Sequence, residues 1–176
     1  MSILQEYEEI RKEMGSTRYD AIGEYLDEVN KDRKQELFLY DVLYKESEYI
    51  KFDEWFNERI KPFRLFNYEN RTYSVLLDQS NFCYDWVDEV KGHSLYGDGH
   101  CYNDLFNDYL EKNYNELNNQ LSYDSENGMF DVDSDDMRIA DSVAWILSKL
   151  YNNEKNMIEL IKETKEKYNY QFNIKI

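Results

Sequence analysis

Apolar residues recur at intervals of three or four positions along the first sixty residues of the chain. This spacing places them on one face of a helix, so it predicts helices at residues 3–14 and 19–29, separated at Gly15. A dense apolar segment at 37–44 indicates a short helix or turn, and residues 52–60 recover helical spacing. The chain is therefore expected to begin with a helical region.

The single proline, Pro62, marks a change of pattern. Beyond it, β-branched and aromatic residues predict a strand at 72–77, and Asn127-Gly128 between two apolar segments predicts a β-hairpin. Asp133 or Ser134 is expected to cap the helix that follows the hairpin. In all, strands are predicted at 63–66, 72–77, 121–123, 129–132 and 170–176, and helices at 80–90, 102–110, 137–150 and 153–167.

These patterns predict an α+β fold, with a small antiparallel sheet packed against helices and a helical N-terminal region before it. Residues 1–61 are expected to form the helical region and residues 62–176 the α+β domain. The chain has 176 residues, of which 41 % are hydrophobic, so it is long and apolar enough to bury a sizeable core.

Charge narrows the choice of partner. The chain carries 21 Lys and Arg against 37 Asp and Glu, which gives a net charge of −16. Such a charge repels nucleic acid and anionic membrane, and the sequence contains no basic cluster that could release the counterions of DNA or RNA. Neither is expected as a direct partner, whereas a basic protein is. Acidity that serves solubility alone is the simpler alternative.

Cysteine usage and the N-terminal residues bear on the compartment. Cys83 and Cys101 form no CxxC pair, and the N-terminal residues lack the basic and apolar segments of a signal peptide. No stretch approaches the roughly 20 apolar residues of a membrane span. A cytoplasmic protein with reduced thiols is expected.

The glycine-rich segment 92–100 contains both histidines and is the first place to look for chemistry. His93, Asp98, His100 and Cys101 could in principle bind a metal, but their spacing matches no helical ligand pair. A nucleophilic cysteine needs positive surroundings, whereas the nearest charges in sequence are aspartates. Neither a metal site nor cysteine catalysis is favoured, and no cofactor is expected.

The segment 131–136 resembles the start of a calcium loop but lacks two of its requirements. Its sixth position is Asp136 where the sharp turn needs glycine, and its twelfth is Ser142 where the loop needs a bidentate glutamate. A simpler interpretation is that Asp131 and Asp133 lie on the outer face of a strand and alternate with the apolar Phe130 and Val132 on its inner face. No catalytic residue is predicted, and the 17 tyrosines favour a protein-binding surface.

Three segments carry a family resemblance, at residues 97–105, 109–111 and 121–130. In them a glycine-containing loop opens a helix, a Tyr-Leu-Glu segment follows, and a strand–turn–strand unit ends in Gly-Met-Phe. From about residue 73 to residue 150 the chain thereby resembles the Imm51 family of bacterial immunity proteins.

This resemblance implies an α+β domain that binds and neutralises a bacterial toxin inside the cell that makes it, without catalytic residues. The toxin is expected to offer a basic active-site surface, because the chain is acidic. Contacts are predicted from exposed acidic and aromatic residues around two loops. These residues are Tyr96, Asp98, His100 and Tyr102 in the first loop, and Asp124, Glu126, Asp131 and Asp133 in the second.

The same acidity also suits a phage or mobile-element anti-defence protein that mimics nucleic acid, such as an anti-CRISPR or antirestriction factor. A protein of that kind would space its carboxylates along one ridge, like phosphates. An enzyme of unknown type is the third possibility, and it would require a pocket with convergent titratable groups.

Overall fold

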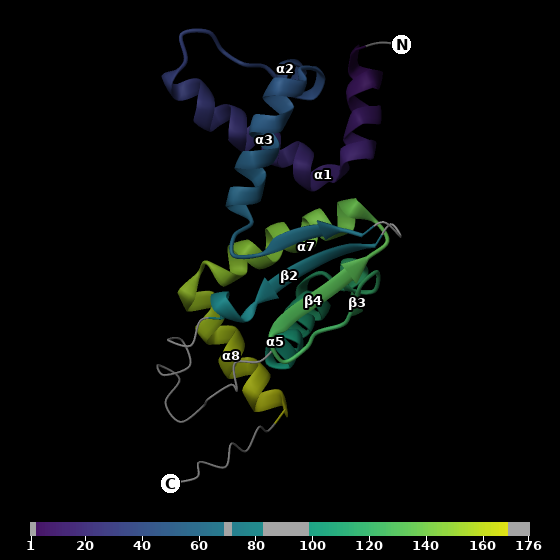
Figure 1. The fold of residues 1–176 in the computed structure, drawn as a ribbon, viewed down its shortest axis with the longest axis vertical. Helices are drawn as coiled ribbons and strands as arrows, with labels where there is room; N and C mark the ends of the chain where they lie inside the picture. Colours follow the sequence, from purple (N-terminus) through teal and green to yellow (C-terminus); the bar gives the residue numbers. More distant parts are fainter. Residues whose placement is uncertain (1–2, 69–71, 83–98, 169–176) are drawn as a thin grey trace. The chain divides into compact units, whose positions relative to one another are not determined.

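The computed structural model describes residues 3–68, 72–82 and 99–168 (Figure 1). The chain divides into two compact units, Met1–Lys61 and Pro62–Ile176. None of the helices within the described residues is both long and apolar enough to cross a membrane.

The first unit is entirely helical in its described part. Its elements are α1 (Ile3–Val29), the 3-10 turn η1 (Asn30–Asp32), α2 (Leu39–Tyr44) and α3 (Glu46–Arg59). Gly15 interrupts α1 with φ 78° and ψ 157°, a conformation that is essentially restricted to glycine. The predicted separation of two helices at Gly15 is therefore confirmed, as is the short helix within residues 37–44.

Aromatic packing and ion pairs hold α1 against α3. Tyr25 and Phe52 meet edge to face at 5.7 Å, and Phe52 and Phe56 are fully buried. Arg18 lies 4.6 Å from the centre of the Phe56 ring and pairs with Asp53 at 2.5 Å. Because the Arg18 side chain is largely buried, this pair fixes the relative position of the two helices as well as adding charge attraction.

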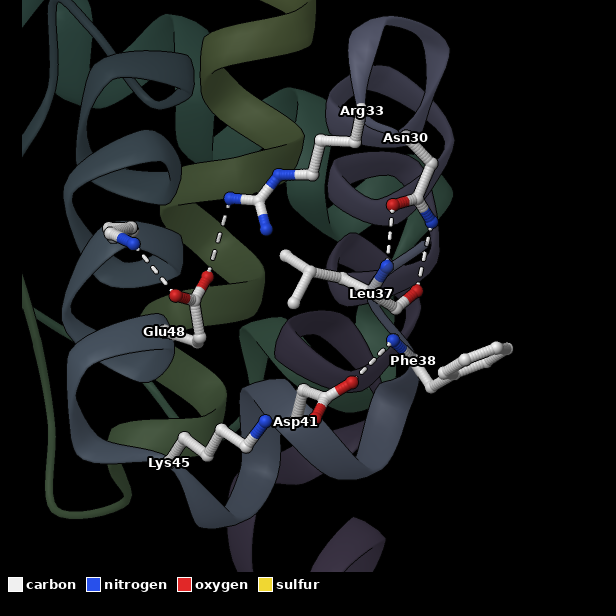
Figure 2. A network of polar contacts seen from close by, with 8 residues as sticks. Asn30, Arg33, Leu37, Phe38, Asp41, Lys45 and Glu48 are labelled. Atoms are coloured by element: carbon white, nitrogen blue, oxygen red, sulfur yellow. Dashed lines mark hydrogen bonds and ion pairs between the residues drawn. The ribbon is translucent and has the colours of Figure 1, made fainter. Parts of the chain in front are cut away.

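The connection between η1 and α2 is held by side-chain bonds to its backbone (Figure 2). The Asn30 amide donates to the Leu37 carbonyl at 2.9 Å and accepts from the Leu37 N–H at 2.8 Å. Asp41 accepts a hydrogen bond from the Phe38 N–H at 2.9 Å. This connection presents Phe38 with 63 % of its surface exposed.

We expect Asn30→Ala to lower the free energy of unfolding by about 1–2 kcal/mol, since both bonds to Leu37 would be lost. Hydrogen exchange at the Leu37 amide should accelerate, because nothing else in the connection replaces the Asn30 acceptor. Asn30→Asp keeps that acceptor and serves as the matched variant, with slower exchange than the alanine variant. Equal exchange in the two variants would show that Asn30 does not hold the connection.

The second unit contains a four-stranded antiparallel sheet with the order β1-β2-β4-β3 (Figure 1). Its strands are β1 (Arg64–Asn67), β2 (Tyr73–Asp78), β3 (Ser122–Tyr123) and β4 (Met129–Ser134). Its helices are α5 (Gly99–Asn113), α6 (Asn115–Asn118), α7 (Met137–Tyr151) and α8 (Glu154–Tyr168), with a 3-10 turn η2 at Gln79–Asn81. The predicted α+β fold with a small antiparallel sheet is confirmed.

Helices α5 and α7 pack on the same face of this sheet (Figure 1). Phe130 of β4 points into this core and meets Phe106 of α5 at 4.9 Å and Phe63 at 6.4 Å. Tyr151 of α7 completes the aromatic cluster, 5.7 Å from Phe63. Alternation along a strand then directs the residues next to Phe130 to the opposite face of the sheet.

Three local predictions need correction or lie outside the described residues. The helix α7 is capped by Asp136, whose carboxylate accepts from the Arg138 N–H at 2.9 Å, and not by Asp133 or Ser134. The reason is that β4 continues through Ser134, so the helix begins later than expected. Only residues 80–82 of the helix predicted at 80–90 are described, and they belong to a 3-10 turn and its end. The strand predicted at 170–176 lies outside the described residues.

Candidate functional site

The first turn of α5 and the tip of the β-hairpin lie in direct contact, although about 27 residues separate them. Gly99 is buried and its N–H donates to the Asn127 carbonyl at 3.1 Å. A side-chain carbon at Gly99 would overlap the carbonyl oxygens of Glu126 and Met129. The glycine therefore permits the helix to begin directly against the hairpin, and it brings together the described parts of the two loops that the sequence singled out.

Acidic residues of this hairpin share the sheet face opposite α5 and α7. Asp131 and Asp133 alternate with the buried Phe130 and Val132 along β4. The Asp124 N–H donates to the Asp131 carbonyl at 3.2 Å, which places Asp124 beside Asp131 on the neighbouring chain segment.

The hairpin turn contributes one more carboxylate to this surface. Glu126 pairs with Met129 at the tip, one position before the buried Phe130, so it continues the same alternation. We refer to Asp124, Glu126, Asp131 and Asp133 as the acidic face.

The facing strands supply smaller and aromatic neighbours to the acidic face. Ser74 of β2 is paired in register with Asp133 and donates its hydroxyl hydrogen bond to that carboxylate. Phe66 of β1 is paired with Ser74 and leaves 42 % of its surface exposed. Sequence reasoning missed both residues, because a strand pattern does not reveal which strands are neighbours.

Asp131 has the most unusual environment of these carboxyl groups. It is 7 % exposed, and its Oδ1 has no hydrogen-bond partner. Burial raises its pKa to about 7, and the negative charges of Asp133, Asp124 and Glu126 act in the same direction. Near neutral pH, Asp131 therefore exchanges between a neutral acid and a carboxylate.

An open hollow adjoins the acidic face where β4 ends. It has a volume of about 470 Å³, and its lining is mainly polar. Asp133 and Asp135 contribute carboxylates to the lining, and Thr72 and Ser122 contribute hydroxyl groups. Within the described part of the chain, no cluster of three or more His, Cys, Asp or Glu residues is arranged to hold a metal ion. The hollow is thus suited to polar side chains of a partner.

The residues predicted for partner contact differ in their accessibility. His100, Asp124 and Glu126 are exposed, and Asp133 is half-buried. Asp131 is buried, whereas the sequence predicted that it would be exposed. Tyr102 lies in the core, where its ring is 4.5 Å from that of Phe82 and only 5 % of its surface is exposed. The Tyr102 side chain packs the domain and is not available to a partner in this structure. Tyr96 and Asp98 lie outside the described residues.

The fold and this site define an α+β domain with an acidic sheet face. Residues 63–166 match the family described as Immunity protein 51, and the chain belongs to that family. No curated protein and no solved structure was found to match it. Membership of this family gives the chain a role in immunity to a toxin.

Proposed function

We propose that the chain neutralises its cognate toxin by binding a basic surface of that toxin through the acidic face, so that the toxin's active site is covered. The grouping, among the described residues, of four unpaired carboxyl groups on one face of the sheet carries this proposal. Elsewhere in the molecule, carboxylates such as Asp53, Asp78 and Glu163 form ion pairs with arginine or lysine. None of the four carboxyl groups of the acidic face pairs with an arginine or lysine among the described residues.

Unpaired carboxylates gathered on one face create a negative potential that is available to an approaching cation. Such a potential speeds association with a basic partner and opposes association with an acidic one. The exposed Phe66 at the side of this face adds the aromatic contact that protein interfaces favour. We therefore propose that the partner is a protein. The chain itself acts as a stoichiometric inhibitor that catalyses no reaction, and it acts in the cytoplasm of the producing cell.

The proposal is tested with the toxin domain encoded beside this gene. Asp124→Lys with Glu126→Lys should raise the dissociation constant at least tenfold, mainly through slower association, and should weaken protection in a growth assay. The loss should shrink at high salt because exposed charges are screened.

The matched control is Glu154→Lys with Glu159→Lys. Both residues are exposed on α8, and the double variant has the same net charge as the test variant. Equal loss in the two double variants would attribute binding to net charge alone. No loss in either would remove the acidic face from the interface, and a chain that protects against no adjacent toxin would contradict the proposed inhibition itself.

A further inference from the structure

The Asp131 carboxyl group is 7 % exposed, and among the described residues it pairs with no arginine or lysine. Oδ1 of Asp131 accepts no hydrogen bond. A buried polar atom that lacks a partner costs the folded state free energy, so its presence calls for an explanation outside the free domain.

The groups around Asp131 are negatively charged, so the partner that its carboxyl group lacks should be positively charged. Asp133 lies two residues along β4, and Asp124 and Glu126 belong to the other half of the hairpin. Their negative charges all disfavour ionisation of Asp131. A neutral donor could satisfy one oxygen atom, but only a cation would also offset this repulsion.

Neighbouring strands offer Asp131 no cation. The residue paired with it on β2 is Leu76, and Ser74 on the same face gives its hydroxyl hydrogen bond to Asp133. Arg64 of β1 is the basic residue in the same row of the sheet, and it is engaged with Asp78. We therefore expect a binding partner to supply the charge that the described residues of these strands do not.

We infer that Asp131, between Asp124 and Asp133, receives one basic side chain of the toxin, most suitably an arginine. The inference rests on the proposed binding of the toxin by the acidic face. A guanidinium group suits this place because it donates several hydrogen bonds in one plane and can serve two carboxylates at once. A metal ion is the competing occupant, and it is an outcome of the test.

Binding of a cation at Asp131 requires the carboxylate form, so complex formation should release a proton. Affinity should increase with pH because Asp131 is partly protonated in the free chain. At higher pH that proton has already been lost, so binding no longer has to displace it. With a pKa of about 7, the contribution of Asp131 to affinity should rise about tenfold from pH 6 to pH 8.

The test is calorimetric titration of the toxin domain with the full chain at pH 6, 7 and 8, in buffers of different ionisation enthalpy. Wild-type protein should release a fraction of a proton at pH 7, and its affinity should increase with pH. Asp131→Asn should bind at least tenfold more weakly at pH 8 and should lose that part of the pH dependence. Asp124→Asn is the matched control: it removes one nearby charge, so the pH dependence should persist with its midpoint at lower pH.

Several outcomes would overturn the inference. Asp131→Asn that binds like wild type, or that keeps the full pH dependence, would show that Asp131 does not receive the cation. Specific binding of Ca²⁺ or Mg²⁺ to the chain alone, abolished by Asp131→Asn, would assign the site to a metal. Binding that survives Asp131→Asn but fails on reversal of Asp124 and Glu126 would leave the proposed function standing without this anchor.

Discussion

Gly99→Ala should lower the free energy of unfolding by about 3 kcal/mol or more. The added methyl group would overlap the backbone carbonyl oxygens of Glu126 and Met129. A flexible side chain could rotate away from such a contact, but the hairpin backbone cannot move without disturbing β4. We therefore expect α5 and the hairpin to separate locally, and urea unfolding followed by circular dichroism would measure the loss.

Gly128→Ala provides the matched control, with the same substitution in the same hairpin. A side-chain carbon there would meet only the end of Gln79, at an ordinary distance of 3.8 Å. Its expected effect is within about 1 kcal/mol. Similar stability of the two alanine variants would contradict the close contact at Gly99, and it would leave the position of the hairpin without this explanation.

The alternation of residues along one strand was enough to predict which residues of β4 face the helices. Phe130 and Val132 are apolar, Asp131 and Asp133 are not, and β4 places the two pairs on opposite faces as predicted. The break at Gly15 was also predictable, because a glycine between two helical patterns is the residue that can leave the helix. Each of these signals is local in the sequence.

The parts of the site that could not be predicted depend on contacts between distant residues. Ser74 and Asp133 are 59 residues apart, and only the strand order places one beside the other. The burial of Tyr102 likewise depends on Phe82 and Tyr151, which belong to separate segments. Helical spacing showed that Tyr102 starts an apolar pattern, but it did not show that the core would enclose this residue.

Asp131 has one feature that the local sequence predicts and others that depend on contacts in the folded domain. Its place on the polar side of β4 was predictable, whereas its burial and its missing partner were not. A sequence gives every aspartate the same ordinary acidity. The charges of Asp124 and Glu126 become relevant to Asp131 only after the turn brings the two halves of the hairpin together.

Asp131→Asn should raise the free energy of unfolding by about 2 kcal/mol at pH 8, although we expect the same substitution to weaken toxin binding. In the folded chain the pKa of Asp131 is raised from 3.8 to about 7. Below pH 4 the group is protonated in both the folded and the unfolded state, so it adds no penalty. As pH rises from 4 to 7 the unfolded chain loses its proton first, so the folded state becomes progressively less stable, and above pH 7 the penalty is constant.

Urea unfolding of wild type and Asp131→Asn at pH 4.5, 6 and 8 would measure this difference. The gap should be small at pH 4.5 and largest at pH 8, whereas exposed Asp124→Asn should shift stability by less than about 1 kcal/mol throughout. A variant that is less stable at pH 8 would mean that Asp131 serves the fold. If Asp131→Asn is more stable and yet binds the toxin more weakly, Asp131 serves binding at a cost in stability, as functional residues often do.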